Sequence, residues 1–338
     1  MTKRIWQLLV ITFIVFSYFL LNAHAEKKAK YVWNITTVGS EASTLGRAEK
    51  LFCELVNYRS KGTMKVTPFY GGALGNLKEG WESLQRGDLA ILFNPLTSAL
   101  GDKRFDVNQF PYLCPTLEDH VRLFGYPEAP FHKLFAKWLK EDGCELIAYG
   151  CEASRNVLTI KKPVHKVEDL TGLKLRIPPV PMWIDFFGKL GVKVTPMAYP
   201  EVYNALQTGI IDGMENPISF IVLQKFYEPA KHLCMTGHAV YSCRMIMTTK
   251  RWNSLPADLQ QLVKQSAHDA MLYLYQLEAY ERRYGLERLK ELGVKITYMP
   301  KEEKAKMRKA AMDILPKYSK SFGPQATDLI KKVLSGEL

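Results

Sequence analysis

The sequence predicts an α/β protein of two lobes joined by one long helix. Strand-like and helix-like segments alternate along the first two thirds of the chain, which is typical of parallel sheets covered by helices. Near residue 153 a second series of the same kind begins. Residues 258–292 then form one helical pattern without proline. At ~1.5 Å per residue this helix is on the order of 50 Å long, which exceeds one lobe and predicts a strut across both.

The composition is that of a globular protein with a large core. Of 338 residues, 47% are hydrophobic and 24% are charged, which excludes disordered, collagen-like and proline-rich chains. The formal net charge is +12, but the lysines are dispersed and no nucleic-acid-binding motif is present. We therefore expect no nucleic-acid partner. A mild positive field would favour anionic solutes that enter a cleft.

The first 25 residues have the layout of a signal peptide. Lys3 and Arg4 precede an uncharged apolar run over residues 5–21, and an A-x-A cleavage site ends at Ala25. We predict that the segment is removed after Ala25 and that the protein is exported to the periplasm. The alternative is a membrane anchor, because seventeen apolar residues are close to the shortest length that spans a bilayer.

Periodicity and turn residues place the elements in order. The first lobe is expected to contain strand 31–37, helix 44–58, strand 64–69, helix 76–86, strand 88–93, helices 118–124 and 131–140, and strand 145–149. The second is expected to contain strands 156–161 and 172–177, helix 182–190, strand 192–195, helix 199–209 and strand 210–214. A β-prone stretch over 233–249 returns the chain to the first lobe.

These elements define the expected domains. The signal peptide covers 1–25, lobe I covers 26–152 plus 241–282, and lobe II covers 153–240 plus 283–338. Six cysteines lie in the exported part, at positions Cys53, Cys114, Cys144, Cys151, Cys234 and Cys243. An oxidising compartment permits disulfides, and the close pairs Cys144/Cys151 and Cys234/Cys243 are the first candidates. Buried thiols that act as small apolar side chains are the alternative.

The sequence does not contain the motifs of the common enzyme classes. It has no G-x-S-x-G elbow, H-E-x-x-H, P-loop or G-x-G-x-x-G. The glycine-rich segment 71–75, GGALG, lacks the Lys-Ser/Thr of a phosphate loop and is expected to be a turn. The histidines are scattered, and none pairs with another at metal-ligand spacing. We therefore predict no catalytic residues, no cofactor and no metal site.

Polar side chains at strand ends instead indicate a binding site. Arg176 lies at the carboxyl end of the strand 172–177, and Asn216 follows the strand 210–214. Ligands of open α/β sheets bind at this end of the strands, and an arginine there can hold a carboxylate through two parallel hydrogen bonds. Arg155 begins the second lobe near the same crossing.

Two segments of this region resemble a known family. Residues 169–178, DLTGLKLRIP, and 211–217, IDGMENP, are similar in order and spacing to the solute-binding subunits of TRAP (tripartite ATP-independent periplasmic) transporters, of the dicarboxylate-binding type. The turn 71–75 and the segment 251–256, RWNSLP, resemble the same family. The resemblance covers nearly the whole exported chain.

The resemblance implies roles for individual residues. Arg176 matches the arginine that clamps the ligand carboxylate, and Asn216 matches the asparagine of the second-lobe site. Arg155 corresponds to a second basic residue, although this chain has Ala-Ser-Arg where the family usually has Gly-Phe-Arg. Tyr199 occupies the position of an aromatic that covers the ligand, and a packing role at the start of its helix is the alternative.

First-lobe contacts are expected where strands of that lobe end. Thr37, Ser40 and Glu41 follow the first strand, and Asn94 follows the third, so both groups would border the crevice. Glu41 would repel an anion, which suggests that it faces a ligand hydroxyl, an amine or a bound water.

The family implies an extracytoplasmic solute receptor with a two-lobed, periplasmic-binding-protein-like fold of the type II-like kind. It would bind a small organic acid, a carboxylate or sulfonate, between lobes that close about a hinge, and deliver it to the TRAP membrane subunits. Two alternatives share the two-lobed plan. One is a periplasmic sensory receptor for an organic acid, and the other is a binding protein of an ATP-driven importer.

Overall fold

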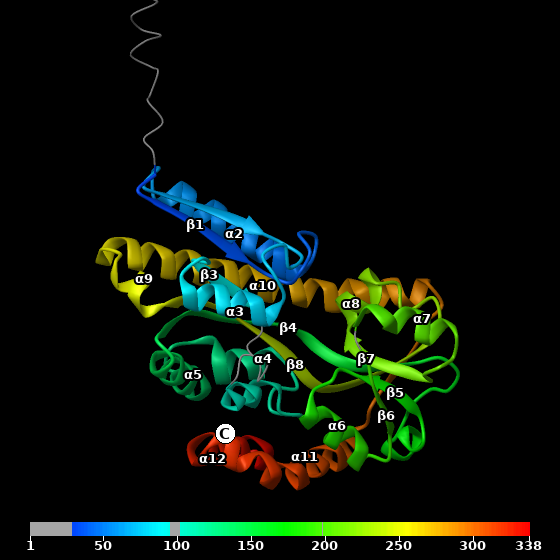
Figure 1. The fold of residues 1–338 in the computed structure, drawn as a ribbon. Coiled ribbons are helices and arrows are strands. Elements are labelled where there is room, and N and C mark those ends of the chain that lie inside the picture. The colour runs from blue at the N-terminus through cyan, green and yellow to red at the C-terminus, as the bar shows by residue number, and fades with distance from the viewer. Residues whose placement is uncertain (1–28, 95–101, 198) are drawn as a thin grey trace, which may run out of the picture.

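The computed structural model describes residues 29–94, 102–197 and 199–338, so the predicted signal peptide and its cleavage site lie outside the described residues. The strands are β1 (Tyr31–Thr36), β2 (Met64–Phe69), β3 (Ile91–Asn94), β4 (Cys144–Thr159), β5 (Lys174–Ile177), β6 (Lys193–Pro196), β7 (Gly213–Pro217), β8 (His232–Thr248) and β9 (Lys295–Tyr298). They form one continuous sheet in the order β2-β1-β3-β8-β4-β7-β5-β6, and β9 pairs with β8. The predicted two-lobed α/β fold is confirmed (Figure 1).

Helices cover this sheet and connect its strands. They are α2 (Thr44–Arg59), α3 (Leu77–Arg86), α4 (Leu117–His120), α5 (Pro130–Glu141), α6 (Pro181–Lys189), α7 (Val202–Gln207), α8 (Ile218–Leu223), α9 (Thr249–Asn253), α10 (Ala257–Glu291), α11 (Lys301–Phe322) and α12 (Pro324–Ser335). Shorter turns of helix are η2 (Lys103–Gln109), η3 (Val121–Gly125, a π-helix), η4 (Val167–Leu170) and η5 (Tyr199–Glu201). In the part of the chain that the structure describes, no helix has the length and apolar character needed to cross a membrane.

The long strands β4 and β8 are shared by both lobes. They run antiparallel along their whole length, with Cys144 opposite Thr248 at one end and Thr159 opposite His232 at the other. β3 pairs with β8 only near residues 244–246, and β7 pairs with β4 only at residues 155–159. The lobes therefore meet along a two-stranded ribbon and not at a flexible loop.

The expectation of two separate strands at 145–149 and 156–161 is wrong, because both belong to β4. Pairing with β8 continues through the glycine and polar residues between them, and the register shifts between Cys151 and Ser154. Such bulges bend a strand without ending it. The hydroxyl of Ser154 donates to the carbonyl of Pro115 at 2.8 Å, beside this bend.

Helix α10 is the predicted strut and matches the expected range within one residue at each end. Toward its first half it packs on α2, where Arg59 binds Asp269 with an N–O distance of 2.6 Å. Toward its second half it packs on α8, and Gly285 lies against the Ile218 side chain. One rigid element therefore contacts helices of both lobes.

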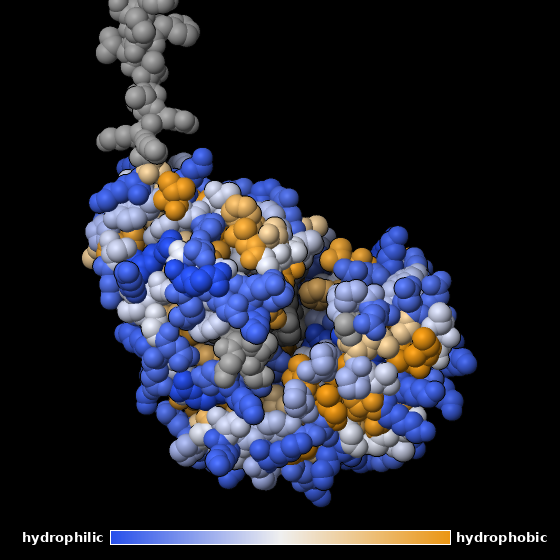
Figure 2. All heavy atoms as spheres, viewed as in Figure 1, coloured by the Kyte–Doolittle hydropathy of each residue, from blue (hydrophilic) through white to orange (hydrophobic). Residues whose placement is uncertain are grey.

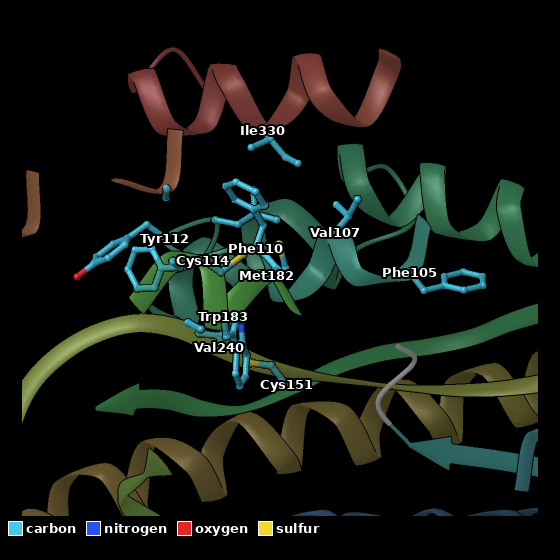
Figure 3. Close-up of a cluster of buried hydrophobic side chains, with 14 of the residues drawn as sticks. Phe105, Val107, Phe110, Tyr112, Cys114, Cys151, Met182, Trp183, Val240 and Ile330 are labelled. Atoms are coloured by element: carbon cyan, nitrogen blue, oxygen red, sulfur yellow. The ribbon is translucent and has the colours of Figure 1, made fainter. Parts of the chain in front are cut away.

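The hydrophobic core crosses between the lobes. Figure 3 shows Phe105 and Phe110, from the segment after β3, in the same cluster as Trp183 of α6 and Ile330 of α12. The predicted lobe limits remain a proposal, since two of them fall inside β4 and β8 and the third falls inside α10.

Candidate ligand-binding site

The second-lobe residues come together on β5 and β7. The two strands are parallel neighbours, and the register places Arg176 beside Met214. Strand β7 spans Gly213–Pro217, so Asn216 lies within the strand and not after it. The expected strand 210–214 is displaced because its first residues form a turn that leads into β7.

Arg176 is buried and carries its charge without an acidic partner in contact. Its Nε and Nη2 atoms donate to the backbone carbonyl of Met197 at 3.1 and 2.9 Å. In the described parts of the chain, no carboxylate oxygen lies within 4 Å of the guanidinium. Burial lowers the pKa of Arg176 to about 10, so the side chain remains protonated at neutral pH.

Tyr199 and Asn216 contact each other next to this arginine. The Asn216 amide donates to the Tyr199 hydroxyl at 3.3 Å, and the Tyr199 ring lies 5.7 Å from the Arg176 guanidinium carbon. The ring also packs edge-on against Phe220 and Phe226. Tyr199 therefore has the packing contacts of one expected role and lies beside Arg176, and its role in covering a ligand stays a prediction.

Arg155 differs from Arg176 because a carboxylate of the protein itself, that of Glu215, neutralises its charge. Its Nε and Nη2 atoms bind the two carboxylate oxygens of Glu215 at 2.5 and 2.8 Å, and both residues are buried. His238 Nε2 lies 3.0 Å from the same carboxylate. Burial alone would raise the pKa of Glu215, but the charge and hydrogen bonds of Arg155, together with His238, hold it at about 2.

Glu215 and Trp183 are neighbours of the site that the sequence analysis did not single out. The Trp183 ring lies 4.9 Å from the Arg155 guanidinium carbon, and its indole N–H donates to the carbonyl of Gln109 at 2.8 Å. Glu215 is the charged residue of the short strand β7, and a buried charge of this kind requires a partner of opposite sign. This feature could have indicated the ion pair from the sequence. Nothing in the local sequence indicated the contact of Trp183.

In the first lobe, Thr37 and Asn94 lie together. Both are buried, and the Asn94 carboxamide oxygen accepts from the Val38 N–H at 2.8 Å and from the Thr37 hydroxyl at 3.4 Å. Ser40 and Glu41 instead lie exposed before α2, and Glu41 forms an ion pair with Lys50 at 2.9 Å. The surface is hollowed between the part of the molecule that carries α2 and α3 and the part that carries α7 (Figure 2).

The chain has recognisable relatives. The family model named DctP, bacterial extracellular solute-binding protein, family 7, matches residues 35–321. The chain belongs to this family. A solute-binding protein of Sulfitobacter sp. is 34% identical over 91% of this chain and 92% of its own length.

Solved structures agree with this membership. The TRAP periplasmic solute-binding protein of Ochrobactrum anthropi, with its C-terminus bound in the ligand-binding pocket, is similar with a TM-score of 0.85 and 28% identity, over 92% of this chain and 97% of that one. The sugar acid-binding protein of Advenella mimigardefordensis in complex with galactonate has a TM-score of 0.78 and 26% identity, over 92% and 99%. The family 7 protein described here is thus a periplasmic receptor of a TRAP transporter and not an enzyme, and the ATP-driven alternative is set aside.

Proposed function

We propose that this family 7 receptor binds a hydroxylated organic acid with a single negative charge, and that Arg176 holds its acid group. One observation carries the proposal. Among the described residues, the Met197 carbonyl is the one hydrogen-bond acceptor of the buried Arg176, whereas Arg155 is bound by Glu215.

The charge balance of the two arginines sets the charge of the ligand. A buried cation is unfavourable unless an anion neutralises it. The Arg155–Glu215 pair is already neutral in charge, so Arg176 is the cation that a ligand would neutralise. One guanidinium matches one carboxylate or sulfonate, bound through two parallel hydrogen bonds. A dicarboxylate would bring a second negative charge to the site. Arg155 could not neutralise that charge, because it is already paired with Glu215.

Neutral polar groups are suited to the rest of the ligand. Asn216, Tyr199, Thr37 and Asn94 offer amides and hydroxyls, which can both donate to and accept from ligand hydroxyls. The galactonate complex of the Advenella protein supports this class, since galactonate combines one carboxylate with several hydroxyls.

Closure of the two lobes on the ligand is expected because the proposed binding residues are divided between them. Arg176, Asn216 and Tyr199 belong to the proposed second lobe, and Thr37 and Asn94 belong to the first. A ligand that contacts both groups has a higher affinity for the closed state than for the open one, and this difference drives closure. The β4–β8 ribbon and α10 guide the motion because they pass through both lobes.

Isothermal titration calorimetry of the exported protein tests the proposal. We would titrate galactonate, D-erythronate, succinate and ethanesulfonate into the wild type, Arg176→Gln and the control Arg86→Gln, whose side chain is exposed on α3. We expect a hydroxy monocarboxylate to bind best. In Arg176→Gln the binding free energy of this acid should weaken by roughly 2–5 kcal/mol, which raises Kd about 30-fold or more. The Kd of Arg86→Gln should equal that of the wild type.

Two results would reject the proposal. Equal affinity of Arg176→Gln and the wild type would place the acid group elsewhere, and tight binding of succinate alone would contradict the single charge. Uptake of the identified acid by cells that carry the membrane subunits distinguishes transport from the sensory alternative, which predicts binding without uptake.

A further inference from the structure

One edge of the sheet is left open in the first half of β4. On one side, residues 144–146 and 148–151 pair with β8, with a bulge at Ile147 where the register shifts. On the other side, β7 pairs only with residues 155–159. Among the described residues, no strand is paired to that second side of residues 144–151. The backbone groups of residues 145–149 that point away from β8 therefore have no strand of the described chain paired to them.

This edge forms the floor of a groove. A cavity of about 790 Å³ lies between α5 and α10, and five consecutive residues of β4, 145–149, line it. Leu146 and Tyr149 share a hydrophobic cluster with α5, whereas Ile147 and Ala148 share one with α10. The two helices therefore cover opposite faces of the sheet, on either side of β4 in Figure 1, and leave its edge between them.

The rim of the groove is basic. Lys133, Lys137 and Lys140 follow one another on α5, and Lys264 faces them from α10. The only carboxylate among the lining residues is Glu145, whose oxygen lies 3.9 Å from Lys140. In the described residues, the other three lysines form no ion pair. None of the predicted ligand-binding residues lines this groove.

We propose that this groove binds an extended acidic segment of a partner protein, which adds a strand to β4. Main-chain hydrogen bonds to residues 145–149 would supply affinity, and the lysines would select glutamate or aspartate side chains on the added strand. Lysines also guard exposed edges against aggregation, but such guards usually lie on the edge strand itself. Here they lie on the flanking helices α5 and α10 and not on the edge strand.

Selection from a phage-displayed library of random ten-residue peptides tests this surface. The library is selected on the exported protein after removal of peptides that bind Lys133→Glu/Lys137→Glu/Lys264→Glu. The control is Lys309→Glu/Lys320→Glu/Lys331→Glu, which makes the same charge change at exposed lysines of α11 and α12. We expect peptides rich in acidic residues that bind the groove variant at least tenfold more weakly and the control as well as the wild type.

Hydrogen exchange distinguishes strand addition from other contacts. We expect the bound peptide to slow amide exchange within residues 145–149 of β4, and N-methylation of alternate peptide amides to abolish binding. The proposal is wrong if no acidic peptide binds the groove variant more weakly than the control. That is the result expected if the lysines only guard the edge against aggregation. The proposal is equally wrong if protection falls on α5 and α10 but not on β4, or if N-methylated peptides still bind.

Discussion

Arg155 and Glu215 form a buried ion pair in which Nε and Nη2 of the arginine face the two carboxylate oxygens at 2.5 and 2.8 Å. The arginine belongs to β4 and the glutamate to β7, so the pair joins two neighbouring strands of the second lobe. The pair also makes the two arginines different. Glu215 neutralises the charge of Arg155, whereas no carboxylate of the described residues contacts Arg176.

Breaking this pair should destabilise the protein strongly. In Glu215→Gln the buried guanidinium loses its counter-ion, and we expect a loss of about 3–5 kcal/mol in the free energy of unfolding, measured by urea titration. The double variant Arg155→Met/Glu215→Leu removes both charges and should regain most of that loss. A cost below about 1 kcal/mol for Glu215→Gln would show that water or another group solvates Arg155.

Glu49 should make the protein less stable as the pH rises. It is buried on α2, and burial raises its pKa to about 9 against a weaker opposing hydrogen bond from the Phe69 N–H. Between pH 4.5 and 9 the folded state keeps a proton that the unfolded state has lost, so rising pH favours unfolding by up to roughly 1.4 kcal/mol per pH unit.

The variant Glu49→Gln isolates this effect. Urea unfolding at pH 5 and pH 8 should give a smaller loss of stability with pH in the variant than in the wild type, because Gln does not titrate. Other groups contribute equally to both proteins. Identical pH dependence in the two proteins would mean that Glu49 is ionised in the folded state.

Gly213 is required where β7 enters the sheet. A Cβ atom at this position would lie 2.4 Å from the carbonyl oxygen of Leu158 on the neighbouring strand, which cannot move aside as a side chain can. We expect Gly213→Ala to cost about 1–3 kcal/mol by urea unfolding. Gly188→Ala on α6 is the matched control, since nothing lies within 4 Å of its Cβ position and no loss is expected.

The six cysteines should be thiols that reagents do not reach in the native protein. All six are buried, and burial raises the pKa of Cys144 to about 12 and of Cys234 to about 11. We expect no reaction with Ellman's reagent until the protein is unfolded, and no change in Tm with dithiothreitol. A mass two daltons below that of the reduced chain would contradict this prediction.

The candidate disulfides fail for a geometric reason. Cys144 and Cys151 lie on the same extended strand, seven residues and therefore roughly 23 Å apart. Cys234 and Cys243 are separated in the same way along β8. The prediction of these pairs is wrong, since closeness in sequence means distance within one strand, and the alternative of buried thiols is confirmed.

Local patterns predicted those parts of the fold that local interactions determine. Helix α10 was predicted nearly to its ends because its residues favour helix and no proline interrupts them. The continuity of β4 was missed because its central residues are not strand formers by themselves. They are held by pairing with β8, a segment far away in the sequence.

In the candidate site, too, features set by local sequence could be predicted and features set by contacts between distant segments could not. That Arg176 and Asn216 lie on neighbouring parallel strands could be predicted from the alternating pattern, although Asn216 lies within β7 and not after its strand. The exposure of Glu41 and the partner of Arg155 could not, because each depends on a side chain from another element. Glu215 stands next to Asn216 in the sequence, but only the tertiary structure shows that it neutralises an arginine of β4.

The ribbon of β4 and β8 also has a consequence for how the chain folds. Cys144 pairs with Thr248, about a hundred residues later, and three hydrophobic clusters of the described residues each contain side chains of both strands. Pairings over such separations slow folding, because the entropy of closing the intervening loop is lost before the new contacts compensate for it. The first-lobe half of the sheet needs the end of β8, and the second-lobe half needs the start of β8 and then β9 at residues 295–298. We therefore expect the protein to fold as one body, because a cut at any of the three lobe limits divides β4, β8 or α10.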